Sequence, residues 1–173
     1  MRGGYNLSDS GIFNLSIGKR ILDTQLVPDG EVPVYSANVV EPFGYINERL
    51  ITDFSVPSVL WGIDGDWQVN YIPAEMEFYP TDHCGVLRVL TDDIHPRCLA
   101  WALEKSGKER GFTRTLRASI DRVKRLKIQL PPIDKQREVA EKVFELESLI
   151  VAAKLELAEL DTKRRAVLDD YLR

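Results

Sequence analysis

Cysteine is scarce in this sequence, because Cys84 and Cys98 are the only two among 173 residues. Two cysteines cannot form a disulfide scaffold, and they cannot supply the four ligands of a cysteine zinc site. Combined with His83 and His95, they match no recognised spacing of zinc ligands. The sequence therefore predicts a protein of a reducing, cytoplasmic compartment that binds no structural metal.

Long apolar runs are also missing. No segment approaches the 18 consecutive apolar residues of a membrane-spanning helix. The N-terminal MRGGYNLSDSG lacks the apolar region of a secretory signal. The composition, with 44% hydrophobic and 29% charged residues, is ordinary for a globular protein. These features argue against a membrane or secreted protein and favour one core with an appendage.

Recognised catalytic motifs are absent as well, including GxGxxG, GxxxxGK[ST], GxSxG and any signature for S-adenosylmethionine. His83 and Cys84 are adjacent, so on a strand they would point to opposite faces; only His95 remains as a base for Cys84. Four acidic residues lie close together, as in some metal nucleases: Asp64, Asp66, Glu75 and Glu77. The first lysine after them is Lys105, which favours a solvated acidic turn. We therefore predict no catalytic residues and no cofactor.

Positive charge is concentrated in one stretch, which we call the basic segment (residues 105–127). The whole chain has a net charge of −4. Residues 1–104 carry 6 Lys/Arg and 15 Asp/Glu, whereas the basic segment carries 9 Lys/Arg and 2 Asp/Glu. Such a cluster can neutralise phosphates even in an acidic protein. A solvated basic face without a ligand is the alternative.

Residues 1–132 have the pattern of an α+β domain. Short runs rich in β-branched and aromatic residues recur between Pro, Gly and Asp, and each has the length of a strand. The predicted strands are 32–35, 45–46, 58–61, 69–72, 85–90 and 126–130. Asp64-Gly65-Asp66 predicts a hairpin turn. A helix is predicted over 98–105 with Asp93 near its N-cap, and a short one from Ser119.

The composition changes after Pro132, because residues 134–173 contain no Pro and no Gly and are rich in good helix formers. We predict one long helix over 133–173 with Asp134 as its N-cap, following a domain at 1–132. At 1.5 Å per residue, such a helix would be roughly 60 Å long.

The predicted helix carries a heptad seam, in which steps of four and three residues alternate for more than four heptads. Its only polar position is Arg164. The other positions are the predicted dimerisation residues: Val139, Val143, Leu146, Ile150, Ala153, Leu157, Leu160, Val167 and Tyr171. One helix cannot bury this stripe alone, which favours a homodimeric coiled coil. The alternative is that the helix folds back on its own domain.

Several segments, taken in order, resemble a known family. They are GKR, VPVYSAN, EPFGYI, WGIDG, TDHCGVL and the LPPIDKQ that opens the long helix. This order resembles the DNA specificity subunit of type I restriction-modification systems, in which a target recognition domain precedes a long conserved helix. The resemblance covers essentially the whole chain. Lys135 departs from it, because the family usually has Glu before this Gln.

The resemblance implies a non-catalytic subunit that recognises one half of a bipartite DNA target and docks an adenine methyltransferase. A separate restriction and translocation subunit would cut unmodified DNA. Family members usually contain two recognition domains and two antiparallel helices, so this chain resembles a half-size subunit or a fragment of a full one. A start at Met1, close to the first motif, favours a separate subunit. Two copies paired about a two-fold axis would recognise an inverted repeat in double-stranded DNA.

Two alternatives remain at the sequence level. One is a recognition domain of a single-chain restriction-modification enzyme with catalytic parts upstream. The other is a coiled-coil scaffold with no DNA role, against which the basic segment counts.

Candidate DNA-binding residues follow from the chemistry of base edges and phosphates. Arg pairs with guanine and Asn pairs with adenine, so these side chains can select a sequence. Contacts to phosphate only position the protein on the DNA. The candidates for base contacts are Lys19, Arg20, Ser36, Asn38 and Arg114. The candidates for phosphate contacts are Lys105, Lys108, Arg110, Arg114 and Arg117, with Thr113, Thr115 and Ser119 as neutral donors. Asn38 can also be interpreted as a turn residue that bonds its own backbone. Lys19 and Arg20 can also be interpreted as solvated charges without a ligand.

We predict that replacing Arg114 and Arg117 together by Ala weakens binding to duplex DNA and flattens its dependence on salt, because fewer counterions are released. The measurement is the slope of log affinity against log salt concentration. An unchanged slope would remove both residues from the phosphate contacts.

Overall fold

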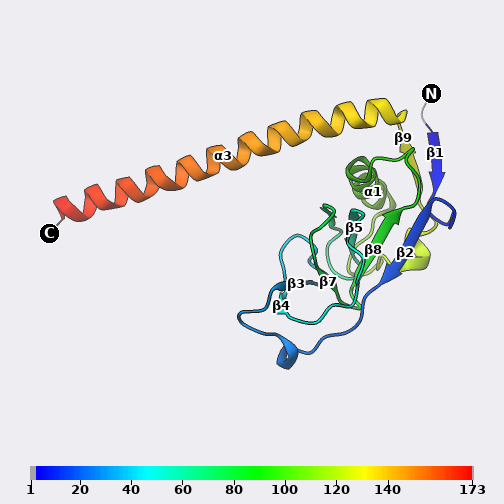
Figure 1. Ribbon diagram of the computed structural model, residues 1–173, viewed down its shortest axis with the longest axis horizontal. Helices are drawn as coiled ribbons and strands as arrows, with labels where there is room; N and C mark the ends of the chain where they lie inside the picture. The colour runs from blue at the N-terminus through cyan, green and yellow to red at the C-terminus, as the bar shows by residue number, and fades with distance from the viewer. Residues whose placement is uncertain (1–2, 173) are drawn as a thin grey trace. The chain divides into compact units, whose positions relative to one another are not determined.

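The computed structural model describes residues 3–172, which divide into two compact units, the first ending at Gln136 and the second beginning at Arg137. The first unit is a mixed α+β domain, as predicted (Figure 1). The long helix α3 (Ile133–Tyr171) begins in the first unit and makes up nearly all of the second. Among the described residues, no helix is long and apolar enough to cross a membrane.

A four-stranded antiparallel sheet forms the centre of the first unit. Its order is β2 (Phe13–Ile17), β8 (Cys84–Val89), β5 (Ser58–Gly62) and β6 (Val69–Ile72). Every residue of β5 is buried, which agrees with its apolar run Val59-Leu60-Trp61. The predicted hairpin between β5 and β6 is confirmed, with Gly65 at a φ of 90°. Helix α1 (Pro96–Arg110) packs against β5, β6 and β9.

Two smaller sheets complete the domain. One has the order β4 (Gly44–Ile46), β3 (Val32–Tyr35) and β7 (Tyr79–Pro80). The other pairs β1 (Gly3–Asn6) with β9 (Lys127–Leu130). The short helices are η1 (Asp23–Gln25) and α2 (Ile120–Val123). All six predicted strands are present, whereas β1, β2 and β7 were not predicted.

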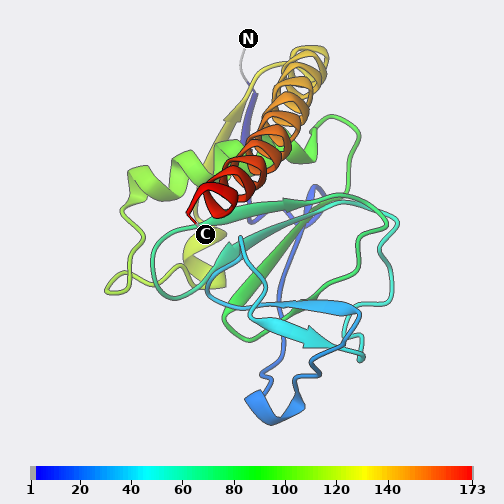
Figure 2. The same cartoon turned by 90° about the vertical axis from the view of Figure 1, so that its left-hand side faces the viewer.

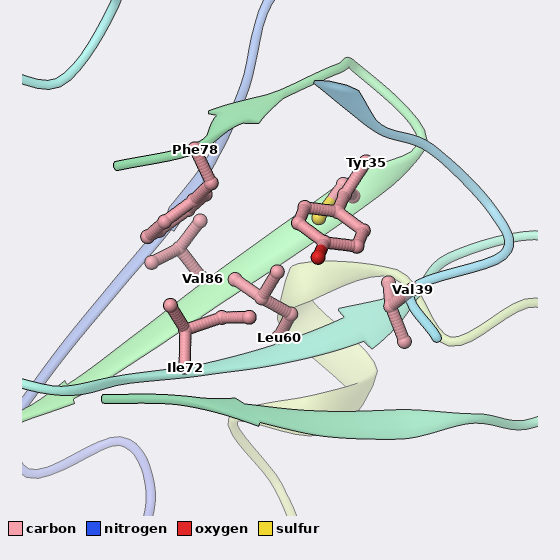
Figure 3. Close-up of a cluster of buried hydrophobic side chains, with 7 residues drawn as sticks. Tyr35, Val39, Leu60, Ile72, Phe78 and Val86 are labelled. Carbon is pink, nitrogen blue, oxygen red and sulfur yellow. The ribbon is translucent and has the colours of Figure 1, made fainter. Parts of the chain in front are cut away.

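Buried side chains from several strands fill the space between the larger sheet and the β4-β3-β7 sheet. Figure 3 shows one cluster, which contains Tyr35, Val39, Leu60, Ile72, Phe78, Cys84 and Val86. Burial raises the pKa of the Cys84 thiol to about 12, so this cysteine stays protonated and unreactive at neutral pH. Burial therefore counts against Cys84 as a nucleophile.

Both predicted helix N-caps are wrong. Helix α1 is capped at His95, and Pro96 occupies its first turn, so Asp93 precedes the helix. Helix α3 begins one residue before Asp134, because the carbonyl of Pro132 accepts the N–H bonds of Lys135 and Gln136 at 3.0 and 3.1 Å. Asp134 instead lies in the first turn of the helix.

Helix α1 is also longer than predicted and passes through Gly107 to end at Gly111, which has a φ of 79°. The Trp67 ring fills the place of a side chain at Gly107, since a Cβ there would lie 2.1 Å from the ring. The glycine therefore serves close packing and does not end the helix.

Gln136 links the start of α3 to the start of α1 within the first unit. Its side chain is fully buried, and its Oε1 accepts the backbone N–H of His95 at 2.9 Å. Its Nε2 donates to the carbonyls of Pro131 at 2.8 Å and Asp93 at 3.3 Å. The Cys98 thiol donates to the Gln136 carbonyl at 3.2 Å. One amide thus satisfies three backbone groups from two segments.

We predict that Gln136→Ala destabilises the domain by about 3 kcal/mol, because it leaves buried backbone groups without partners. The measurement is the free energy of unfolding in urea. Gln129→Ala is the matched control, since Gln129 is exposed on β9 and should change stability by less than about 0.5 kcal/mol. Equal effects of the two substitutions would contradict this role of Gln136.

Candidate nucleic-acid interface

Five chain segments meet at one end of the four-stranded sheet, where β2 and β5 end and β8 begins. The N–H of Ile63, after β5, donates to the carbonyl of His83 at 3.0 Å. The N–H of Ala118 in turn donates to the carbonyl of Ile63 at 3.0 Å. After β2, the N–H of Lys19 donates to the carbonyl of Pro80 at 3.1 Å. We call this set of segments the loop cluster: residues 18–20, 36–38, 62–66, 80–83 and 111–119.

The segment 36–38 is fixed against the ends of β5 and β7. The N–H of Thr81 donates to the carbonyl of Tyr35 at 2.9 Å, and the Thr81 hydroxyl donates to that of Ser36 at 3.1 Å. Gly62 lets the chain approach closely, because a Cβ there would lie 2.2 Å from the carbonyl oxygen of Ala37. The Ser36 side chain is therefore held in place by the sheet.

The loop between α1 and α2, residues 111–119, can be followed in Figure 2. Side-chain contacts anchor it at both ends. At one end, buried Phe112 packs on Trp67 with ring centroids 5.1 Å apart. At the other end, the indole N–H of Trp61 donates to the carbonyl of Ala118 at 2.9 Å. We call this stretch the recognition loop.

Between its anchors, the recognition loop forms a hydrogen-bonded turn. The N–H of Thr113 donates to the carbonyl of Leu116 at 3.1 Å, and the Thr113 hydroxyl lies 3.0 Å from that of Thr115. Arg114 is exposed at the tip of this turn. The arrangement presents a long cationic side chain from a fixed backbone.

A carboxylate joins the recognition loop to two other segments. Asp64 accepts hydrogen bonds from Arg117, at 2.9 Å from Nη2, and pairs with Nδ1 of His83. Burial acts to raise the pKa of Asp64, but the hydrogen bonds from His83 and Arg117 outweigh it and hold the pKa below its usual value. Arg117 was predicted to contact phosphate, and in this structure its guanidinium holds the loop to the β5–β6 turn.

Lys19, Arg20, Ser36, Asn38 and Arg114 are far apart in sequence, and each lies on one of the segments that meet in the loop cluster. Lys19 and Arg20 are exposed there. The turn interpretation of Asn38 is confirmed, because its Oδ1 accepts the N–H groups of Val40 at 2.9 Å and Glu41 at 3.1 Å.

The predicted phosphate contacts on α1 lie before the recognition loop. Lys105 pairs with Glu109 at 3.7 Å and Lys108 with Glu104 at 2.5 Å, so their charges are partly compensated on the same helix. Arg110 is exposed next to the loop.

Asp64 and Trp61 are the residues whose positioning roles the sequence did not indicate. Asp64 was interpreted as part of a solvated acidic turn, and its pairing with Arg117, 53 residues away, corrects that interpretation. No local signal marks such a pair.

Comparison with known proteins agrees with this architecture. Residues 8–160 match the family model described as the type I restriction modification DNA specificity domain. The chain belongs to this family. A Mycoplasma pneumoniae protein described as a type I specificity subunit is 31% identical over 149 residues, which are 83% of this chain and 39% of that protein. Another, described as the N-terminus of such a subunit, is 36% identical over 74 residues, or 43% of this chain and 39% of that protein.

Solved structures show the same fold for type I specificity domains. The type I S subunit from M. genitalium aligns with a TM-score of 0.71 at 20% identity, over 95% of this chain and 44% of that one. The HsdS subunit from Thermoanaerobacter tengcongensis aligns with a TM-score of 0.61 at 13% identity, over 87% of this chain and 38% of that one. The chain thus spans about two fifths of the length of the first curated relatives it matches.

We predict that Asp64→Asn destabilises the domain at neutral pH and that this effect disappears in acid. Because the folded-state pKa is lowered, the stabilisation from ionised Asp64 is fully present above the ordinary Asp pKa of about 3.9 and is lost as the pH falls through the lowered value. The measurement is the thermal midpoint of wild type and variant from pH 7 to pH 2. Asp66→Asn, at an exposed position of the same turn, is the control. A difference that does not depend on pH would contradict the role of the charge.

Proposed function

We propose that this specificity domain recognises one half of a bipartite DNA target and performs no catalysis itself. The observation that carries the proposal is the loop cluster, where residues predicted to contact base edges come together from separate segments. Base readout needs hydrogen-bonding groups at fixed positions, and the anchored recognition loop supplies Arg114 in that way. Lys19, Arg20, Ser36 and the amide group of Asn38 are the other proposed base contacts.

Phosphate contacts are proposed for the cations around the recognition loop. Arg110 is exposed just before the recognition loop, and Arg114 is exposed at the tip of its turn. Arg117 contributes positive charge from beside Asp64. Lys105 and Lys108 contribute less, because each faces a glutamate on α1. Such contacts fix the register of the protein on DNA without selecting a sequence.

The helix of the second unit supports a proposal of self-association. Its heptad seam is exposed beyond Val143; for example, Ile150 is 53% and Leu157 is 62% exposed. An apolar stripe of this length requires a partner helix. We propose that two copies pair antiparallel through the nine seam residues predicted above, which places two recognition domains in inverted orientation.

A second apolar stripe lies on another face of the same helix. It is formed by Phe144, Val151, Leu155 and Ala158, which also follow heptad spacing. The stripe is continued by Ser148 and Thr162, whose hydroxyls donate to the carbonyls of Phe144 and Ala158 at 2.9 Å. A two-stranded coiled coil covers only the seam. We propose that the second stripe docks the methyltransferase subunit.

The other partners are those that the family implies. An adenine methyltransferase would modify the recognised site, and a restriction and translocation subunit would act on unmodified DNA in the cytoplasm. A coiled-coil scaffold without DNA contact is the competing function, and the experiment below separates the two.

We predict that selection from a pool of random duplexes, with the chain alone and then with its methyltransferase, enriches an inverted repeat with a fixed gap. A two-fold dimer with one recognition domain per copy requires this symmetry. A single half-site would instead indicate a monomeric reader and contradict pairing of two copies. No enrichment under either condition would reject DNA recognition in favour of the scaffold.

We predict different effects of charge on the two faces of α3. Replacing Ile150 and Leu157 by Asp should yield monomers in analytical ultracentrifugation, because it buries charge in the seam. Replacing Val151 and Leu155 by Asp is the matched control with the same charge and similar exposure, 58% and 64%. This control should stay dimeric but lose the methyltransferase in co-purification. If the variant with Asp at positions 150 and 157 still formed dimers, pairing through the heptad seam would be contradicted.

A further inference from the structure

We infer that the region around α2 and the start of β9 forms a second contact surface, which holds a phosphodiester backbone beside the bases that the loop cluster contacts. The inference rests on the proposed function and extends it to residues outside the predicted site. We call this surface the cationic track: Arg117, Arg122, Lys124, Arg125 and Lys127.

Two neighbouring hollows define the track. The larger, of about 700 Å³, is lined in part by Arg117, Arg122 and Arg125. The smaller, of about 360 Å³, is lined in part by Lys124, Arg125 and Lys127. Because Arg125 lines both, the hollows form one continuous surface. Both are open to solvent, as a surface that follows a polymer backbone must be.

Charge in the track is compensated only in part, since Arg117 pairs with Asp64 and Asp121 lines both hollows. Two carboxylates line the hollows, Asp82 and Asp121, against five cationic side chains. Within residues 3–172, no carboxylate forms an ion pair with Lys124, Arg125 or Lys127. This differs from Lys105 and Lys108 on α1, which face glutamates. Cations without partners in an open hollow favour an anionic ligand.

Neutral donors and a fixed guanidinium complete the surface. Ser119 lines the larger hollow, and Asn6 and Ser8 line the smaller one. Nη1 of Arg122 donates to the carbonyl of Arg117 at 2.8 Å, which fixes its side chain at the edge of the recognition loop. Arginine, lysine, hydroxyl and amide groups together are the usual partners of phosphate oxygens.

The position of the track favours DNA over an acidic protein segment. Ile63, Asp82 and Arg117 line the larger hollow and also belong to the loop cluster. A strand whose phosphates occupy the hollows therefore continues directly past Asp64 and the recognition loop. The track would neutralise phosphates flanking the recognised bases, and so it would raise affinity for every sequence equally.

The experiment compares Arg125→Gln/Lys127→Gln with Lys154→Gln/Lys163→Gln, a control that removes the same charge from α3 outside the seam. Each protein is titrated with the duplex that wild type selects and with an unrelated duplex, over a range of salt. The track variant should bind both duplexes about 10- to 100-fold more weakly, and its log–log salt slope should be shallower by about 2, since each phosphate contact contributes about 0.9. Its selected sequence and thermal midpoint should not change.

Three results would overturn the inference. An unchanged salt slope means that the track does not contact phosphate. A slope changed equally in the control means that only net charge matters. If the track variant binds DNA normally but loses the methyltransferase in co-purification, the track contacts an acidic protein partner instead. The proposed function fails separately, when wild type itself shows no preference for any duplex.

Discussion

The hydrogen bond between the indole N–H of Trp61 and the carbonyl of Ala118 is the constraint on which the candidate interface depends. Trp61 is fully buried on the central strand β5, and its ring lies where a side chain at Gly85 of β8 would be. A buried indole donor without a partner costs about 1–3 kcal/mol, so the recognition loop stays attached to the sheet. The C-terminal end of the loop, at Ala118, is therefore held in a fixed position by a residue of the buried core.

The other anchors follow from this one. With Ala118 fixed, Arg117 lies beside Asp64 of the β5–β6 turn, and Asp64 also holds His83 at the start of β8. Phe112 fixes the opposite end of the loop on Trp67. The tip with Arg114 then projects from a backbone held at both ends. Because both ends of the loop are anchored in the domain, residues at its tip can be substituted without disturbing the packing of the sheet.

Much of the secondary structure was predictable because its signals are local. The strand 58–62 contains the apolar run Val59-Leu60-Trp61 between turn residues, and α3 lacks Pro and Gly. The missed elements lack such signals. Strand β1 contains two glycines and becomes a strand only through pairing with β9, more than 120 residues away. Strand β7 has two residues, one of them a proline. The helix predicted over 98–105 continues through Gly107 to Arg110, and Gly107 makes room there for the Trp67 ring.

The candidate interface was predictable by residue type but not by arrangement. Arg and Asn in turn-rich segments were the basis for predicting base contacts at Arg20, Asn38 and Arg114. Their meeting at one end of the sheet depends on backbone pairings between distant segments, such as Ile63 with His83 and Ala118. The pairing of Arg117 with Asp64 likewise depends on tertiary structure. The sequence therefore assigned Arg117 to phosphate alone, and it left the roles of Trp61 and Asp64 unassigned.

The central claim is that anchored loops from separate segments present base-reading side chains, with Arg114 at the tip of the recognition loop. The most direct measurement repeats the duplex selection with Arg114→Ala and compares the enriched sequence with that of wild type. The account predicts that one base position in each half-site becomes degenerate while the gap and the other positions stay the same. An identical enriched sequence would show that Arg114 reads no base and would contradict the account.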